Sequence, residues 1–443
     1  MREVITIQVG QGGIQVGNAC WELFCLEHQI QLNGQLINQQ IIDKNDALRT
    51  LFFESDLQKL VPRSILLDLE SSIIDEVKTG KFKEMFNPEQ LISGKGGTAH
   101  NFGRGYYSIG QEYIDTVYVW REQENLLKIV LHFKDLQYSI RLVEGQVQVL
   151  VLCYLINYQL GIIIYPSPET QVSMVEPYNS ILATQSLIDH ADVCITMDNQ
   201  AIYDICKNKL DVEVPKYSNL NRMIAQVMSS ITASMRYDGP LLREMAELEN
   251  SLVPYAKFKF LICTYAPIIS YQKLDHLQLS TIEISKLAFE TTNMMAKCDP
   301  RLGKYMSCCL LYRGDIIPKD VSYSISQIKT QKTIRFVDWC PTGLKVGIDY
   351  QVQQTLPEDD IRKAQRSACM IGNTTAVSQV FSELCHKYDS MFSKRAFVHW
   401  YIKEGMEEAQ FVEAREELAC LLIDYEEADS EINEGNYEEN AGP

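Results

Sequence analysis

The sequence lacks several features that would assign it to common classes of protein. It has no run of about 18 or more apolar residues, so no segment is expected to span a bilayer. Its longest apolar stretch, residues 147–156, is interrupted by Gln148 and followed by Asn157. The first residues, MREVITIQVGQGG, lack a cationic start followed by an apolar run, so a secretory signal is not expected. The 13 cysteines show no C-x-x-C spacing, which favours buried, reduced thiols over disulfides or a zinc site.

Two nucleotide-binding signatures are also missing. No G-K-[ST] of a P-loop occurs, and the glycine turn that begins at Gly10 is not G-x-G-x-x-G, because its sixth position is Gln15. The second absence disfavours a nicotinamide-dependent dehydrogenase on a similar sheet.

Basic residues are almost absent from the C-terminal 40 residues. This segment holds 14 acidic residues and one arginine, Arg415, and so supplies −13 of the net charge of −17. The rest of the chain is nearly neutral. Such a tail is expected to be solvated and to attract basic protein partners rather than nucleic acid, although a purely solubilising role fits its composition equally well.

Patterns of apolar residues predict an α/β fold. With 46% hydrophobic and 22% charged residues, the chain is suited to a globular protein with an ample core. Strands are predicted over residues 2–9, 64–69, 192–197, 258–263 and 304–313, and helices over 15–28, 221–237, 376–388 and 409–427. Several strands end at glycines or polar residues, which indicates a ligand site at the carboxyl edge of a parallel sheet.

The residues at these strand ends suggest phosphate and base binding. Glycines after the first strand, from Gly10, would bring backbone N–H groups to a helix start, where phosphate is favoured, although a plain tight turn explains them as well. Glu70 could hold Mg²⁺ through water, or simply begin a helix. Asn199 and Asn221 offer amides that suit a guanine edge, and Tyr217 could stack on a base. Taken singly, each residue fits a structural role better than a functional one.

The motifs taken together resemble the α-tubulin family from end to end. They include MREVITIQVGQGG, VEPYNSIL, DNQAIYDIC, CDPRLGKYM, FVDWCPTG and KRAFVHWY, in that order. The resemblance fails mainly over residues 122–164. It implies a parallel-sheet GTP-binding domain (1–236, including a core helix), an α+β intermediate domain (237–375), and a C-terminal helical hairpin with an acidic tail (376–443).

The resemblance also implies roles for single residues. It places Gly10, Gln11, Gly12, Ala99, His100 and Asn101 at the GTP phosphates, Glu70 at Mg²⁺, Glu176 at the ribose, Asn199 and Asn221 at the guanine edge, and Tyr217 at the base face. Two departures stand out. Gly96-Gly97-Thr98 replaces an acidic, asparagine-rich loop and His100 replaces an asparagine. The family's threonine ahead of Glu176 falls on Val172.

Glu247, in EMAELENSLVPY, indicates the α type. In α-tubulins this acid reaches the GTP of the adjoining β subunit and orients the attacking water, whereas β chains carry lysine. The implied protein is a microtubule subunit and a GTPase whose hydrolysis is completed in trans, while its own GTP is not hydrolysed. Its partners would be β-tubulin, further dimers, and motors and microtubule-associated proteins, in cytoplasmic arrays such as cilia or the spindle.

The family's phosphate loop, S-F-G-G-G-T-G-S-G-F, is missing where this chain has residues 139–150. Bulky side chains there cannot adopt the glycine turns, so the chain as written is expected to lose tight GTP binding. One hypothesis is an out-of-frame segment: codons exist for residues 137–150 whose frame from the third base encodes V-F-H-S-F-G-G-G-T-G-S-G-F. The alternative is a degenerate tubulin-like chain, a scaffold or non-functional protein without nucleotide.

Modification sites differ from the family in part. Lys44 lies in the loop that is often acetylated, but its register is open, so no modification is assigned. The chain ends in Pro443 rather than tyrosine, so a cycle of terminal tyrosine removal is not expected. Glu434, Glu438 and Glu439 remain candidates for polyglutamylation.

Overall fold

The computed structural model describes residues 4–37, 46–55, 59–94, 96, 99–109, 135–141, 158–165, 173–237, 245–270, 279–331, 334–340, 343–356 and 360–430. For residues 46–47, 109, 135–141, 158–159, 245–246 and 331 it describes the backbone alone. The lysine-bearing loop at Lys44, the position Val172, the residues after Arg141 and the acidic tail beyond Ser430 lie outside the described residues.

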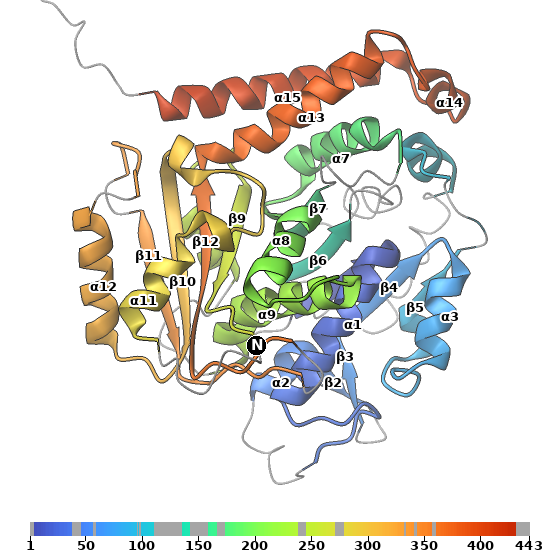
Figure 1. The fold of residues 1–443 in the computed structure, drawn as a ribbon. Coiled ribbons are helices and arrows are strands. Elements are labelled where there is room, and N and C mark those ends of the chain that lie inside the picture. The colour runs from blue at the N-terminus through green and yellow to red at the C-terminus, as the bar shows by residue number, and fades with distance from the viewer. Residues whose placement is uncertain are drawn as a thin grey trace, which may run out of the picture.

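A ten-stranded sheet runs through the molecule in the order β11-β10-β12-β9-β8-β7-β6-β1-β4-β5 (Figure 1). The strands are β1 (Val4–Val9), β4 (Ser64–Asp68), β5 (Leu91–Ser93), β6 (Asp135–Arg141), β7 (Tyr158–Tyr165), β8 (Val193–Asp198), β9 (Phe260–Ala266), β10 (Tyr305–Gly314), β11 (Leu344–Asp349) and β12 (Arg366–Thr374). From β5 to β9 all neighbours are parallel, whereas β12 is antiparallel to both β9 and β10. A hairpin of β2 (Phe52–Glu54) and β3 (Leu60–Pro62) stands apart.

Helices cover both faces of this sheet. They are α1 (Gly10–Glu27), α2 (Asp46–Leu51), α3 (Ser71–Thr79), α7 (Glu176–His190), α8 (Asn199–Lys209), α9 (Tyr217–Arg236), α10 (Met245–Leu252), α11 (Thr281–Ala288), α12 (Pro318–Gln331), α13 (Ser378–Phe392), α14 (Val398–Lys403) and α15 (Glu408–Asp429). The prediction of an α/β fold is confirmed.

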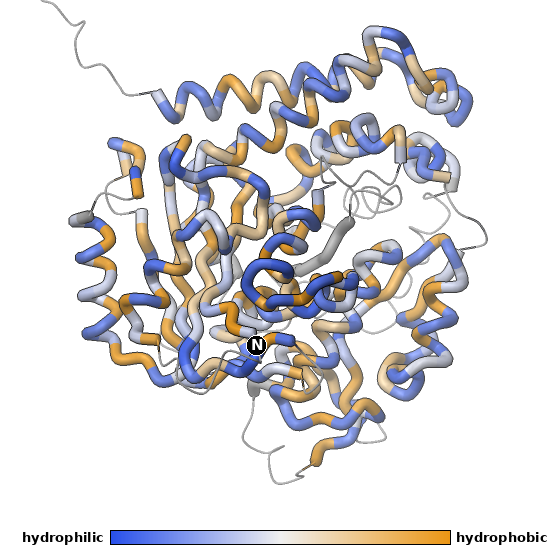
Figure 2. The backbone as a smooth tube through the Cα atoms, viewed as in Figure 1, coloured by the Kyte–Doolittle hydropathy of each residue, from blue (hydrophilic) through white to orange (hydrophobic). Residues whose placement is uncertain are grey.

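Alternation along the strands creates two hydrophobic cores, one on each face. In β1, Ile5, Ile7 and Val9 belong to the core under α7, α13 and α15, while Val4 belongs to the core under α1 and α9. Both faces are buried, as expected for a parallel sheet enclosed by helices. Helices α13 and α15 lie across α7 in Figure 1, and Figure 2 shows hydrophilic and hydrophobic residues alternating along both of them.

Two helices begin earlier than the sequence predicts. The helix predicted over 15–28 begins at Gly10, because the positive φ of Gly10 (72°) lets the chain turn from β1 directly into the helix. The helix predicted over 221–237 begins at Tyr217, since the Asn219 side chain accepts a hydrogen bond from the Lys216 N–H (2.8 Å) and caps the start. The second shift brings Tyr217 and Asn221 onto one helix.

The described cysteines form no disulfide and are mostly buried, such as Cys20 and Cys194. Burial raises the pKa of both thiols to about 12. No helix in the described part of the chain combines the length and apolarity needed to cross a membrane.

A buried ion cluster joins three distant elements. The carboxylate of Glu27, near the end of α1, pairs with Arg236 of α9 (2.6 Å) and with Arg313 of β10 (3.1 Å). The Ser229 hydroxyl contacts both carboxylate oxygens of Glu27 at 2.8 Å. All three charged side chains are at most 1% exposed. Burial alone would raise the pKa of Glu27, but Arg236 and then Arg313 outweigh it and lower the pKa to about 2.

Replacing Glu27 with glutamine is expected to lower the free energy of unfolding by about 3–5 kcal/mol at pH 7, because two buried guanidinium groups lose their nearest counter-charge and, among the described acids, Arg313 keeps only Asp349, at 4.0 Å. A lowered pKa stabilises the folded state above the unfolded pKa. The difference between parent and Glu27→Gln should therefore shrink as the pH falls from about 4.5 towards 2. Chemical denaturation across this pH range measures it.

Asp389→Asn is the matched control for this experiment. Asp389 is half exposed and pairs with Arg415 at 2.9 Å on the molecular surface. Loss of this ion pair is expected to lower the free energy of unfolding by no more than about 1 kcal/mol. Equal losses for the two variants would contradict a special role for the buried cluster.

Candidate functional site at the carboxyl edge of the sheet

The carboxyl ends of the parallel strands lie level with one another. In the ladders, Val9 of β1 pairs with Leu67 of β4 and with Ile140 of β6, and Tyr165 of β7 pairs with Asp198 of β8. The residues that follow these ends therefore share one edge. Gly10, Glu70 and Asn199 are among them, as the sequence predicted.

The first turn of α1 offers backbone donors at this edge. The helix begins at Gly10 without an intervening loop, and Gln11 and Gly12 form its first turn, which contains no acidic residue. The unpaired N–H groups and the positive end of the helix dipole favour an anion here, with no carboxylate on the turn to repel it.

The loop at Ala99 and His100 is held in a left-handed conformation. Both residues have positive φ (51° and 60°), which is uncommon for residues other than glycine. Asn179 of α7 fixes the loop, because its amide donates to the His100 carbonyl (2.8 Å) and its oxygen accepts from the Phe102 N–H (3.3 Å). Asn101 donates its amide to the Trp400 carbonyl of α14 (3.1 Å). This side chain thus fastens the loop to the C-terminal helices.

Two of the predicted acids are also engaged by the chain itself. Glu176, the first residue of α7, is 1% exposed and accepts the Ser173 N–H at 3.0 Å. Glu70 stands at the cap position of α3, is exposed, and accepts the Ser72 hydroxyl at 2.8 Å. No group of three metal-ligating side chains occurs in the described part of the chain. A single exposed carboxylate fits Mg²⁺ that is carried mainly by phosphate oxygens and water.

Asp198 is a carboxyl group at this edge whose pKa is raised. This carboxyl ends β8, is buried, and caps α8 by accepting the Gln200 N–H at 2.8 Å. Burial raises its pKa to about 6, although the Gln200 hydrogen bond opposes the shift. The neighbouring Asn199 begins α8 and is half buried.

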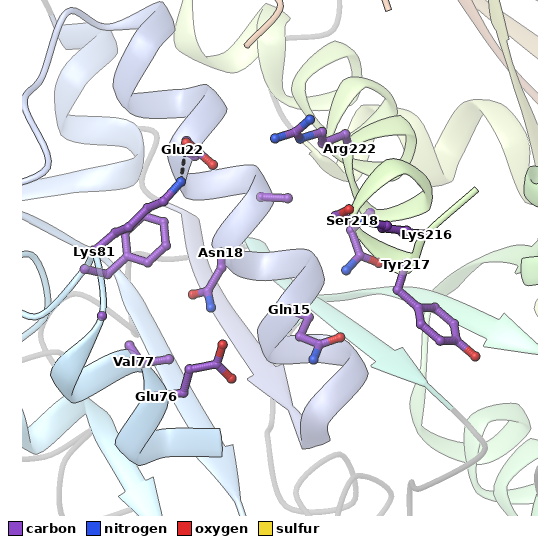
Figure 3. Close-up of a pocket in the computed structure, with 14 residues that line it drawn as sticks. Gln15, Asn18, Glu22, Glu76, Val77, Lys81, Lys216, Tyr217, Ser218 and Arg222 are labelled. Carbon is purple, nitrogen blue, oxygen red and sulfur yellow. Dashed lines mark hydrogen bonds and ion pairs between the residues drawn. The ribbon is translucent and has the colours of Figure 1, made fainter. Parts of the chain in front are cut away.

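A cavity of about 590 Å³ lies between α1, α3 and the start of α9 (Figure 3). Two predicted base contacts line it: Tyr217, whose side chain is about half exposed at the rim, and Asn221 one turn further along α9. Gln15 and Asn18 project into it from α1, and Glu76 faces them from α3 (Figure 3). Gly10, Gln11, Gly12, Glu176 and Asn199 are not among its lining residues.

The contribution of α1 to this cavity was not predicted from the sequence. Gln11, Gln15, Asn18 and Glu22 follow at helical spacing and form one polar stripe on a helix that is otherwise mostly buried. That stripe was the available signal. The negative charge of Glu22, which also lines the cavity, is partly neutralised because its carboxylate pairs with the Lys81 ammonium at 3.5 Å.

Glu247 lies away from the edge and the cavity. It sits in the first turn of α10, which is anchored on the C-terminal strands because the Leu252 carbonyl accepts the hydroxyl of Ser307 (2.6 Å) and the amide of Asn373 (2.9 Å). Glu247 is half buried. The structure therefore does not bring it together with the other predicted site residues.

Comparison with known families gives two matches. The sequence model described as "Tubulin/FtsZ family, GTPase domain" matches residues 3–120 and 151–207. The one described as "Tubulin C-terminal domain" matches residues 256–386. Together they cover most of the chain. The first match contains the edge residues from Gly10 to Asn199, and the residues it skips, 121–150, overlap the segment 122–164 where the resemblance fails.

The raised pKa of Asp198 predicts a pH-dependent gain from Asp198→Asn. Ionisation of the carboxylate costs stability as the pH rises from its usual pKa of 3.8 through about 6, whereas asparagine keeps the helix cap without a charge. The variant should therefore gain up to about 3 kcal/mol over the parent above pH 6 and little below pH 4. Thermal unfolding between pH 4 and 8 measures this. A difference that does not change with pH would contradict the assignment.

Proposed function

Because the chain belongs to the tubulin superfamily, we propose that it is an α-type tubulin subunit that binds GTP and assembles with a β-type partner into microtubules. One observation carries the nucleotide part. The helix that begins at Gly10 supplies both the backbone donors at the strand edge and the polar stripe of the cavity lined by Tyr217 and Asn221. Phosphates and base would thus lie along a single helix.

Each proposed contact has its own chemistry. The first turn of α1 and the loop of Ala99, His100 and Asn101 would hold the phosphates through backbone N–H groups. Asn221 and Asn199 would pair with the guanine edge, and the exposed ring of Tyr217 would stack on the base. Glu176 would accept from the ribose, and Glu70 would hold Mg²⁺ through water. When bound, the ion neutralises phosphate charge.

Glu247 supports assignment to the α type and a role on a neighbouring subunit. Within the described residues its carboxylate makes no hydrogen bond or ion pair, so it is available to a partner. An exposed aromatic pair, Tyr255 and Trp339, with ring centroids 5.5 Å apart, follows α10 on the surface. Such an exposed aromatic pair suits a protein interface. There the carboxylate would align the attacking water and accept its proton.

The missing phosphate loop supports the hypothesis of an out-of-frame segment. Strand β6 is paired in register between β1 and β7, so Arg141 ends the strand next to the edge where the loop is needed. The family match stops at residue 120 and resumes at 151, which brackets the loop. A chain whose correct frame restores the glycines would bind GTP. The rival is a degenerate chain that folds on the same sheet without nucleotide.

The remaining assignments follow the family. We propose units at 1–236, 237–375 and 376–443, although the first two share one sheet, since Cys194 of β8 pairs with Phe260 of β9. The tubulin family is typically cytoskeletal, and a cytoplasmic location follows from it. Helices α13 and α15 with the acidic tail would form the surface for motors and associated proteins.

GTP-dependent melting tests nucleotide binding and the out-of-frame hypothesis together. Two chains are compared: the chain as printed, and one in which codons 137–150 are read in the shifted frame. GTP at about 100 times the Kd should stabilise the restored chain by about 2.7 kcal/mol, because ligand binds only the folded state. The printed chain should gain much less, since it lacks the loop.

The outcomes separate the rival readings. Equal stabilisation of both chains would show that the loop is dispensable. No stabilisation of either would support the degenerate alternative. Sequencing the transcript across codons 120–170 decides independently whether the printed frame is the translated one.

Glu247→Gln is expected to permit assembly with a β-type partner but to lower GTP hydrolysis in the polymer by about 10²-fold or more, because glutamine cannot take up the proton. Phosphate release per assembled subunit measures this. Glu249→Gln, two residues along the same helix, is the matched control and should hydrolyse at the parental rate. An unchanged rate in Glu247→Gln polymer would remove this residue from the mechanism.

A further inference from the structure

A lysine from an edge strand holds the helix that carries Glu247. The ammonium of Lys345, on β11, donates to the Ser251 hydroxyl at 2.7 Å and lies 3.4 Å from the backbone carbonyl oxygen of Glu247. Ser251 donates its own hydroxyl to the same carbonyl. Two donors, the Lys345 ammonium and the Ser251 hydroxyl, thus converge on the backbone carbonyl of Glu247.

The contact stabilises α10 along its length. This helix has only eight residues, from Met245 to Leu252, and no basic residue in its last turn. A short helix is marginal without tertiary contacts, and a cation near its C-terminal turn complements the helix dipole. Lys345 supplies that cation from outside the helix.

The contacts of Lys345 with α10 do not involve the carboxylate of Glu247. Lys345 contacts the backbone carbonyl of Glu247 and, within the described residues, forms no ion pair with its carboxylate, which leaves the acid to a partner. The ammonium is also not needed to hold its own strand, because β11 pairs with β10 from Cys308↔Leu344 to Arg313↔Asp349. The Lys345 side chain is half buried, and its hydrogen bond to Ser251 shows that it reaches α10.

We propose that Lys345 is a positioning residue for Glu247: it fixes the backbone of α10 so that the carboxylate meets the partner's water in one geometry. This inference rests on the proposed trans role of Glu247. A displacement of a catalytic group by about 1 Å can lower the reaction rate about 100-fold. The rate should therefore depend strongly on the contacts that fix the backbone of α10.

The test compares Lys345→Met with Lys345→Arg and with Lys329→Met, an exposed lysine on α12, as the matched control. In polymer formed with a β-type partner, Lys345→Met should hydrolyse GTP about 10-fold or more slowly at unchanged extent of assembly, because α10 shifts. Lys345→Arg should restore most of the rate, since it keeps a cation and donors. Lys329→Met should match the parent.

Combination with Glu247→Gln separates the two proposals. If Lys345 acts through Glu247, adding Lys345→Met to Glu247→Gln should slow hydrolysis no further. A slow Glu247→Gln polymer together with a parental rate for Lys345→Met would overturn the positioning role alone. Parental rates for both single variants would instead overturn the trans role of Glu247.

Amide hydrogen exchange supplies a readout that needs no assembly. In the purified chain, Lys345→Met should speed exchange within α10 at least about tenfold, while Lys345→Arg and Lys329→Met leave it near parental. Exchange in α10 that is unchanged in folded Lys345→Met would overturn the proposal, whatever the variant does in polymer.

Discussion

One buried carboxylate holds the architecture together. Glu27 ends the helix that begins at the carboxyl edge of the sheet, Arg236 ends the helix that begins at the cavity, and Arg313 belongs to the C-terminal part of the sheet. Burying these charges costs several kcal/mol each unless they are paired, so the three elements are constrained to one mutual arrangement. The positions of Gly10 and Tyr217 at the opposite ends of their helices depend on it. The carboxyl edge of the sheet and the C-terminal strands are therefore coupled through a single ion cluster.

Much of the fold was predictable because it follows from local pattern. Apolar β-branched runs such as residues 4–9 and 193–198 can only be buried strands of an enclosed sheet, and the long helix through Met223 shows its period directly. The exact helix starts were not predictable, since they depend on the positive φ of Gly10 and on the Asn219 cap. The ion cluster was hidden too, because Glu27, Arg236 and Arg313 are 77 or more residues apart.

The candidate site was predictable in its parts and less so in its geometry. Glycine and asparagine at strand ends pointed to the edge, but nothing in the sequence shows that Asn101 turns its amide to Trp400 or that Ser173 binds Glu176. These contacts depend on the folded geometry, so no pattern of residue spacing in the sequence reveals them. By contrast, the polar stripe through Gln15 and Asn18 is visible in the sequence as polar residues at helical spacing.

The seam between β8 and β9 has a mechanical consequence. These strands join the two halves of the sheet through a short ladder, Cys194↔Phe260 to Thr196↔Ile262, whereas β7 and β8 pair from Leu160↔Val193 to Tyr165↔Asp198. Under a bending load, as along a curved filament, strain concentrates where the fewest bonds cross. The buried ion cluster bridges this seam, because Glu27 belongs to α1 on one side and Arg313 to β10 on the other, so the cluster would resist bending where the ladder is short.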